Sequence, residues 1–111
     1  MLTSRSAIGR SDLAVSPICL GTNVFGWPAD EATSFAVLDA FIDAGGNFLD
    51  SANIYSAWVP GLSGGESETS IGRWLAKRGR RDDGGIATKS GMAGGPDFPK
   101  GLDRGNIRAG I

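Results

Sequence analysis

The sequence predicts an α/β fold in which short parallel strands alternate with helices. Apolar runs that end in glycine or in a charged residue alternate with segments of helical periodicity, and glycines gather between these segments. The order strand, helix, strand, helix, strand implies right-handed βαβ units and a parallel sheet with helices packed on it. The 111 residues, 41% of them hydrophobic, fall within the size range of one domain and can build a core.

A hairpin and a first strand are expected before the first helix. The hairpin candidate runs from Ala7 to Val15 and turns at Gly9 to Asp12. The apolar run Pro17 to Leu20 that follows is predicted to be a strand that ends at Gly21. These segments form the N-terminal part of the predicted fold.

Two further strands are each followed by a long polar loop rich in glycine. The second strand spans Asn47 to Leu49 or Asp50, and the loop after it spans Ser51 to Gly65. The third strand spans Gly85 to Thr88, and the loop after it spans Ser90 to Leu102. The long loops therefore share one edge of the sheet.

Helices are predicted where apolar residues recur every three or four positions. The first lies within residues 29–46, the second begins with Ser67 as N-cap, and the third begins with Asp103 as N-cap. The apolar residues on one face are Phe35, Leu38, Phe41 and Ile42 in the first helix, and Ile71, Trp74 and Leu75 in the second.

Two architectures fit this order of elements, a doubly wound sheet and a (β/α)₈ (TIM) barrel. The loops favour the barrel, because every long loop follows a strand and every return from helix to strand is short. Such a barrel takes about 250 residues. We therefore expect residues 1–111 to be the N-terminal part of one barrel domain, a hairpin and about three βα units, with the C-terminal part absent from this chain.

The charge and cysteine content exclude several classes of protein. Eleven basic and twelve acidic residues give a net charge of −1, which provides no electrostatic attraction to nucleic acid or to an anionic membrane. Cys19 is the only cysteine and histidine is absent, so we expect neither a disulfide nor a metal site. The N-terminus has no apolar run typical of a signal peptide, and a cytoplasmic location is expected.

Three strand ends carry residues that could form a site on one rim. Gly21 is followed by Thr22, the second strand ends on Asp50, and the third is followed by Lys89, with Tyr55 in the loop between. A carboxylate buried without a partner costs several kcal/mol, so Asp50 needs a cation, and Lys89 is the candidate.

Several motifs agree in order with one known family. The stretches LGTNVFG, NFLDSANIY, GGESETSIG and ATKSG resemble the aldo-keto reductase superfamily, and the resemblance extends from GRSDLAVSPICLGT to GLDRGNIR. The resemblance implies that Asp50, Tyr55 and Lys89 are three members of a catalytic tetrad. The fourth member in that family is a histidine at the end of the next strand, and this sequence contains no histidine.

The resemblance also implies an activity, the reduction of an aldehyde or ketone by hydride transfer from NADPH. Tyr55 would donate the proton, Lys89 would stabilise the phenolate, and Asp50 would keep Lys89 charged and in place. The substrate would be a small carbonyl compound. The implied cofactor-binding residues are Gly21, Thr22, Asn23 and Asp50, and the implied substrate-binding residues are Trp27, Tyr55 and Trp58.

Each assignment has an alternative. An aspartate after a strand is often a cap, Tyr55 could pack a loop, and the two tryptophans could cover the mouth of the barrel. The chain could be a non-catalytic nucleotide-binding or regulatory relative, or an inert truncated product, and we expect residues 1–111 alone to be inactive. Ser51 stands where threonine is more usual, and Tyr55 is followed by SAWVP where many members have glycine. The substrate, the preference for NADPH over NADH and the oligomeric state stay open.

Overall fold

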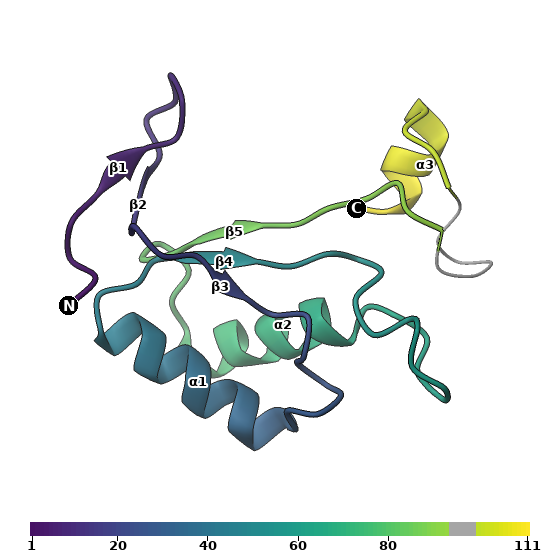
Figure 1. Ribbon diagram of the computed structural model, residues 1–111, viewed down its shortest axis with the longest axis horizontal. Coiled ribbons are helices and arrows are strands. Elements are labelled where there is room, and N and C mark those ends of the chain that lie inside the picture. The colour runs from purple at the N-terminus through teal and green to yellow at the C-terminus, as the bar shows by residue number, and fades with distance from the viewer. Residues whose placement is uncertain (94–99) are drawn as a thin grey trace.

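The computed structural model of the chain describes residues 1–93 and 100–111 and consists of a hairpin, a small parallel sheet and three helices (Figure 1). The predicted loop from Ser90 to Leu102 falls partly outside the described residues. The strands are β1 (Ser6–Ala7), β2 (Ala14–Val15), β3 (Leu20–Gly21), β4 (Phe48–Asp50) and β5 (Gly85–Ala87), and the helices are α1 (Glu31–Asp43), α2 (Glu66–Arg78) and α3 (Arg104–Ala109). No helix in the described part of the chain is long and apolar enough to cross a membrane.

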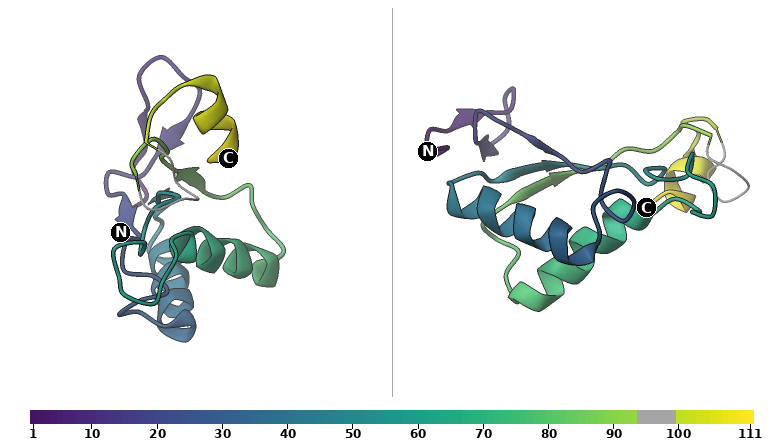
Figure 2. Two further views of the ribbon diagram at one scale, coloured as in Figure 1. Left: turned by 90° about the vertical axis from the view of Figure 1, so that its right-hand side faces the viewer. Right: turned by 60° about the horizontal axis from the view of Figure 1, so that its bottom comes forward.

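The three parallel strands lie side by side in chain order, β3, β4, β5. Leu20 pairs with Leu49 and Leu49 with Ile86, so these side chains point to one face of the sheet, and Asp50 points to the other. Helices α1 and α2 both pack on the face that Leu49 occupies (Figures 1 and 2). A doubly wound sheet carries helices on both faces, whereas a barrel wall carries them only outside, so this arrangement favours a barrel.

The hydrophobic core lies between this sheet face and the two helices. Its buried members are Phe25, Leu38, Leu49, Ile71 and Trp74. Trp74 is 3% exposed, as expected for the apolar face of α2, and its indole Nε1 donates to Asp39 Oδ1 at 2.8 Å. The Arg78 guanidinium stacks on the Trp74 ring at 4.5 Å and forms two hydrogen bonds to Asp83. The two helices and the start of β5 are thereby linked around one aromatic ring.

The helix starts confirm one predicted cap and correct another. Asp103 caps α3, because its Oδ1 accepts from Gly105 N and Asn106 N. Ser67 was expected to cap the second helix, but α2 begins at Glu66 and Gly65, at φ 85°, is its N-cap. A left-handed backbone at that position suits glycine, which has no Cβ to clash. Ser67 therefore lies inside the first turn, where its hydroxyl is free for other partners.

The first strand of the sheet is displaced from its predicted position. The sequence predicts Pro17 to Leu20, whereas β3 is Leu20–Gly21. Ser16 Oγ donates to the carbonyl of Ile18 at 2.8 Å, and this hydrogen bond bends the chain just before β3, the strand that pairs with β4. Only the last residue of the apolar run therefore joins the parallel ladder.

Candidate active site

Asp50, Tyr55 and Lys89 meet at the carboxyl end of the sheet. Lys89 Nζ lies 2.7 Å from Asp50 Oδ2, and the Tyr55 hydroxyl donates to the same Oδ2 at 3.3 Å. The Lys89 ammonium also lies 4.9 Å from the centroid of the Tyr55 ring. The acid at the end of β4 thus has the lysine partner that the sequence analysis required.

Backbone hydrogen bonds beyond the strands bring these side chains together. Ser51 N donates to Ala87 O at 2.8 Å, and Asn53 N donates to Lys89 O at 3.1 Å. The ladder between β4 and β5 therefore continues for several residues after the strands end, and it carries Lys89 alongside the segment that follows Asp50. The position of the lysine is fixed by backbone geometry as well as by its charge.

Lys89 is held in its charged form. Its Nζ donates to Asp50 Oδ2 and, at 2.8 Å, to the carbonyl oxygen of Ser51. Partial desolvation lowers the pKa of Lys89, but the interactions with Asp50 and Tyr55 outweigh it, so the pKa lies above its usual value. At neutral pH the Tyr55 ring therefore faces a fixed positive charge.

Tyr55 begins a row of aromatic side chains. Trp58 lies edge-to-face with Tyr55 at 6.0 Å between ring centroids, and Trp27 lies edge-to-face with Trp58 at 6.5 Å. Trp27 is 50% exposed and Trp58 is 52% exposed, so each presents a ring surface to solvent. Of the two predicted substrate-binding tryptophans, Trp58 contacts the ring of the predicted proton donor, and Trp27 contacts Trp58.

The predicted cofactor-binding residues differ in what they can offer a ligand. Gly21 and Asn23 are exposed at the end of β3. Thr22 between them is fully buried, and its hydroxyl is engaged with Asp50 O and Ser67 Oγ. Thr22 therefore has no free hydroxyl for a cofactor. Within residues 1–93 and 100–111, no group of three histidine, cysteine or acidic residues could hold a metal ion.

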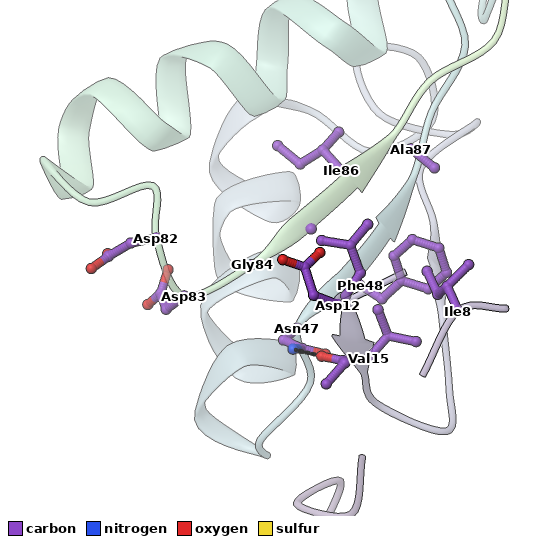
Figure 3. Close-up of a pocket in the computed structure, with 13 residues that line it drawn as sticks. Ile8, Asp12, Val15, Asn47, Phe48, Asp82, Asp83, Gly84, Ile86 and Ala87 are labelled. Carbon is purple, nitrogen blue, oxygen red and sulfur yellow. Dashed lines mark hydrogen bonds between the residues drawn. The ribbon is translucent and has the colours of Figure 1, made fainter. Parts of the chain in front are cut away.

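Among the cavities in the described part of the chain, two bear on the site. A pocket of about 150 Å³ adjoins the site and is lined by Ala52, Asn53, Ile54, Tyr55, Lys89, Ser90 and Met92. A larger one, of about 600 Å³, lies away from Asp50, between the hairpin and the first residues of β4 and β5. Figure 3 shows Ile8, Val15 and Phe48 gathered on that side of the sheet, where no charged pair resembling Asp50 and Lys89 is found among the lining residues.

Ser56, directly after Tyr55, has a left-handed backbone. Its φ is 77°, and it is the only residue other than glycine with positive φ among the described residues. Its side chain is fully buried, and its hydroxyl has no hydrogen-bond partner within residues 1–93 and 100–111. This conformation accounts physically for the glycine expected after the tyrosine, since glycine adopts it without strain.

Replacing Ser56 by glycine is expected to stabilise the protein by roughly 1 kcal/mol. The substitution relieves left-handed backbone strain of about 1–3 kcal/mol in the folded state. It also stabilises the unfolded chain by about 0.4–1 kcal/mol, because glycine has more backbone entropy there, but this opposing effect is smaller. The measurement is the midpoint of urea unfolding. Ser70→Gly is the matched control, because Ser70 is buried in the interior of α2 and there glycine should destabilise. A lower midpoint for Ser56→Gly would contradict the strain argument.

Comparison with known proteins gives a consistent assignment. The family model described as "Aldo/keto reductase family" matches residues 17–111. The "Uncharacterized 11.2 kDa protein in crtE 3'region" of Pseudescherichia vulneris is 46% identical over 86 residues, which cover 77% of this chain and 84% of that protein. Norsolorinic acid reductase of Aspergillus flavus is 46% identical over 85 residues, which cover 70% of this chain and 20% of the reductase.

A solved structure supports the same assignment from the fold. A Pseudomonas aeruginosa protein assigned to the aldo-keto reductases aligns with a TM-score of 0.76 at 29% identity, over 98% of this chain and 40% of that protein. The chain thus spans 20% and 40% of these two longer relatives, and its sheet corresponds to the N-terminal part of their fold. The chain belongs to the aldo/keto reductase family.

Proposed function

We propose that residues 1–111 form the N-terminal part of a single barrel domain of an NADP-dependent oxidoreductase that reduces aldehydes or ketones to alcohols. The observation that carries the proposal is the placement of one ammonium, Lys89 Nζ, between the Asp50 carboxylate and the Tyr55 ring. The family membership supports the same chemistry.

The rim above Asp50 suits a flat cofactor ring. A Cβ added at Gly21 would approach only the Asn23 side-chain oxygen, at 3.9 Å, so the end of β3 is open beside Asp50. Gly21, Asn23 and Asp50 are the residues that would hold the nicotinamide portion, together with the backbone of Thr22. When bound, the reduced nicotinamide supplies the hydride.

The side chains of this chain then handle the proton. As the substrate carbonyl becomes an alkoxide, the Tyr55 hydroxyl gives up its proton to the alkoxide oxygen. The Lys89 ammonium stabilises the phenolate that forms, because the two opposite charges are close in a partly desolvated site. Asp50 holds Lys89 in position, and solvent returns the proton to Tyr55. Trp27 and Trp58 would contact the body of the substrate beside Tyr55.

The proposal is tested in a chimaeric barrel, in which residues 1–111 are followed by the C-terminal remainder of the Pseudomonas aeruginosa protein. We expect aldehyde-dependent oxidation of NADPH, and a loss of at least ~100-fold in turnover number for Lys89→Met. Lys77→Met is the matched control, because Lys77 lies on α2 over the Phe35 ring and away from Asp50. An active chimaeric barrel that keeps its full rate in Lys89→Met would refute the assigned chemistry.

A further inference from the structure

Three buried hydroxyl groups lie directly behind Asp50. Thr22, Ser51 and Ser67 are each 0% exposed, and Ser67 Oγ lies 2.7 Å from Thr22 Oγ1 and 2.9 Å from Ser51 Oγ. We call these three residues the hydroxyl triad. It joins the end of β3, the end of β4 and the first turn of α2, which are far apart in the sequence.

The direction of the hydrogen bonds follows from counting protons. Thr22 gives its one hydroxyl proton to the Asp50 carbonyl, at 2.8 Å, because a carbonyl can only accept. Ser67 must therefore donate to Thr22, and Ser51 must donate to Ser67. Each hydroxyl therefore donates to one partner only. The hydrogen bonds run from Ser51 to Ser67, from Ser67 to Thr22, and from Thr22 to the carbonyl oxygen of Asp50.

The residues held by the triad are also those that hold Lys89. The carbonyl of Asp50 accepts from Thr22 N as well as from Thr22 Oγ1, and its carboxylate accepts from Lys89. The carbonyl of Ser51 accepts a second hydrogen bond from Lys89 Nζ. Both acceptors of the ammonium thus belong to two consecutive residues, and the triad fixes those residues from the buried side.

We propose that Ser67 is a positioning residue, which acts through the hydroxyl triad to hold Asp50 and Ser51 where they fix the Lys89 ammonium against Tyr55. The catalytic consequence rests on the function proposed above, whereas the effect on Lys89 does not. Without the Ser67 hydroxyl, Thr22 loses its donor and Ser51 loses its acceptor inside a fully buried space. The Asp50–Ser51 segment can then shift, and Lys89 loses part of the hydrogen bonding that favours its charged form.

The first test measures Lys89 directly in the full chain. The rate at which its amine reacts with an acylating reagent, read by mass spectrometry over alkaline pH, reports the fraction of neutral amine. The groups facing this amine are Asp50, Tyr55 and Cys19, and none of them is changed in the variants. We expect Ser67→Ala to raise the rate at least ~3-fold, which corresponds to a fall of about half a unit in the pKa of Lys89.

The matched control is Ser70→Ala. Ser70 is buried on the same helix, and its hydroxyl donates within that helix to Glu66 O. We expect this variant to react at the wild-type rate. Ser51→Ala interrupts the same triad from the strand side and should behave like Ser67→Ala, and Ser67→Thr, which keeps the hydroxyl, should restore the wild-type rate. An unchanged rate in Ser67→Ala and Ser51→Ala, or an equal rise in Ser70→Ala, would overturn the inference.

The second test is kinetic and uses the chimaeric barrel. Ser67→Ala should lower kcat about 10-fold with little change in KM, because a misplaced ammonium affects the proton transfer more than the binding of substrate. If the chimaeric barrel reduces no carbonyl compound, the proposed function fails, and the labelling of Lys89 still decides whether Ser67 positions it. A normal kcat in Ser67→Ala would overturn the catalytic part of the inference.

Discussion

Replacing Tyr55 by phenylalanine is expected to lower the turnover number of the chimaeric barrel at least ~100-fold, the usual contribution of a general acid. Phenylalanine keeps the ring that faces Trp58 and Lys89 but lacks the hydroxyl that bonds to Asp50. Cofactor affinity should change little, because the proposed nicotinamide contacts lie at Gly21, Thr22, Asn23 and Asp50, and the substitution replaces none of these residues. Steady-state kinetics give kcat, and fluorescence titration with NADPH gives Kd.

The matched control for this substitution is Trp58→Phe. This substitution also makes an aromatic side chain in the same row smaller, but it removes no proton donor from the Asp50–Lys89 cluster. We expect it to raise KM and to leave kcat within a few-fold of the wild-type value. Equal turnover by Tyr55→Phe and the wild-type protein would remove Tyr55 from the mechanism.

The second large effect concerns residues 1–111 on their own, which we expect to self-associate and to show no NADPH-dependent reduction of aldehydes. One sheet face packs on α1 and α2, whereas the opposite face carries the apolar cavity that Ile8, Leu13, Val15 and Phe48 help to line (Figure 3). Burial contributes about 25 cal/mol per Å², so covering roughly 400 Å² of apolar surface on this face would contribute about 10 kcal/mol. That is comparable with the whole stability of a typical domain, about 5–15 kcal/mol.

Size-exclusion chromatography with light scattering measures this directly. We expect a mass well above the 11.5 kDa of one chain, or precipitation. Phe48→Gln should shift the protein toward the monomer because Phe48 lies on the open face, whereas Val37→Gln, at an exposed apolar position on α1, should not. A monodisperse monomer with a cooperative thermal transition would contradict the predicted self-association. Measurable turnover by that monomer would contradict the predicted inactivity.

Local sequence signals predicted the elements, because their causes lie within a few residues. The apolar repeat in α1 and α2, and Asp103 before α3, depend on neighbours three or four positions away. The meeting of Asp50 with Lys89 was also predictable, because the carboxyl ends of neighbouring parallel strands share an edge. The Asp50 side chain is 38% exposed, however, so it is not the buried carboxylate that the sequence argument assumed. Tyr55 joined them through the family resemblance.

What the sequence analysis missed depends on contacts between distant segments. Ser67 has the residue type and place of an N-cap, and only the packing of α2 against β3 and β4 brings it to Thr22 and Ser51. The departure from glycine after Tyr55 was visible in the sequence, but its backbone strain at Ser56 was not. The first strand was placed too early because hydrophobicity marks an apolar run, whereas pairing depends on the register with Leu49.

The hydrogen bonds that continue the ladder past β4 and β5 also determine when the site can assemble. Asp50 and Lys89 are 39 residues apart in the chain, so their contact closes a long loop. Closing this loop costs conformational entropy before the ion pair can form. A slip of one residue in the pairing would point Asp50 to the opposite face of the sheet. The lysine therefore acquires its partners only after β4 and β5 have paired in the correct register. We expect the ion pair to form late in folding, which makes the chemical reactivity of the Lys89 amine a usable reporter of the last step toward the native state.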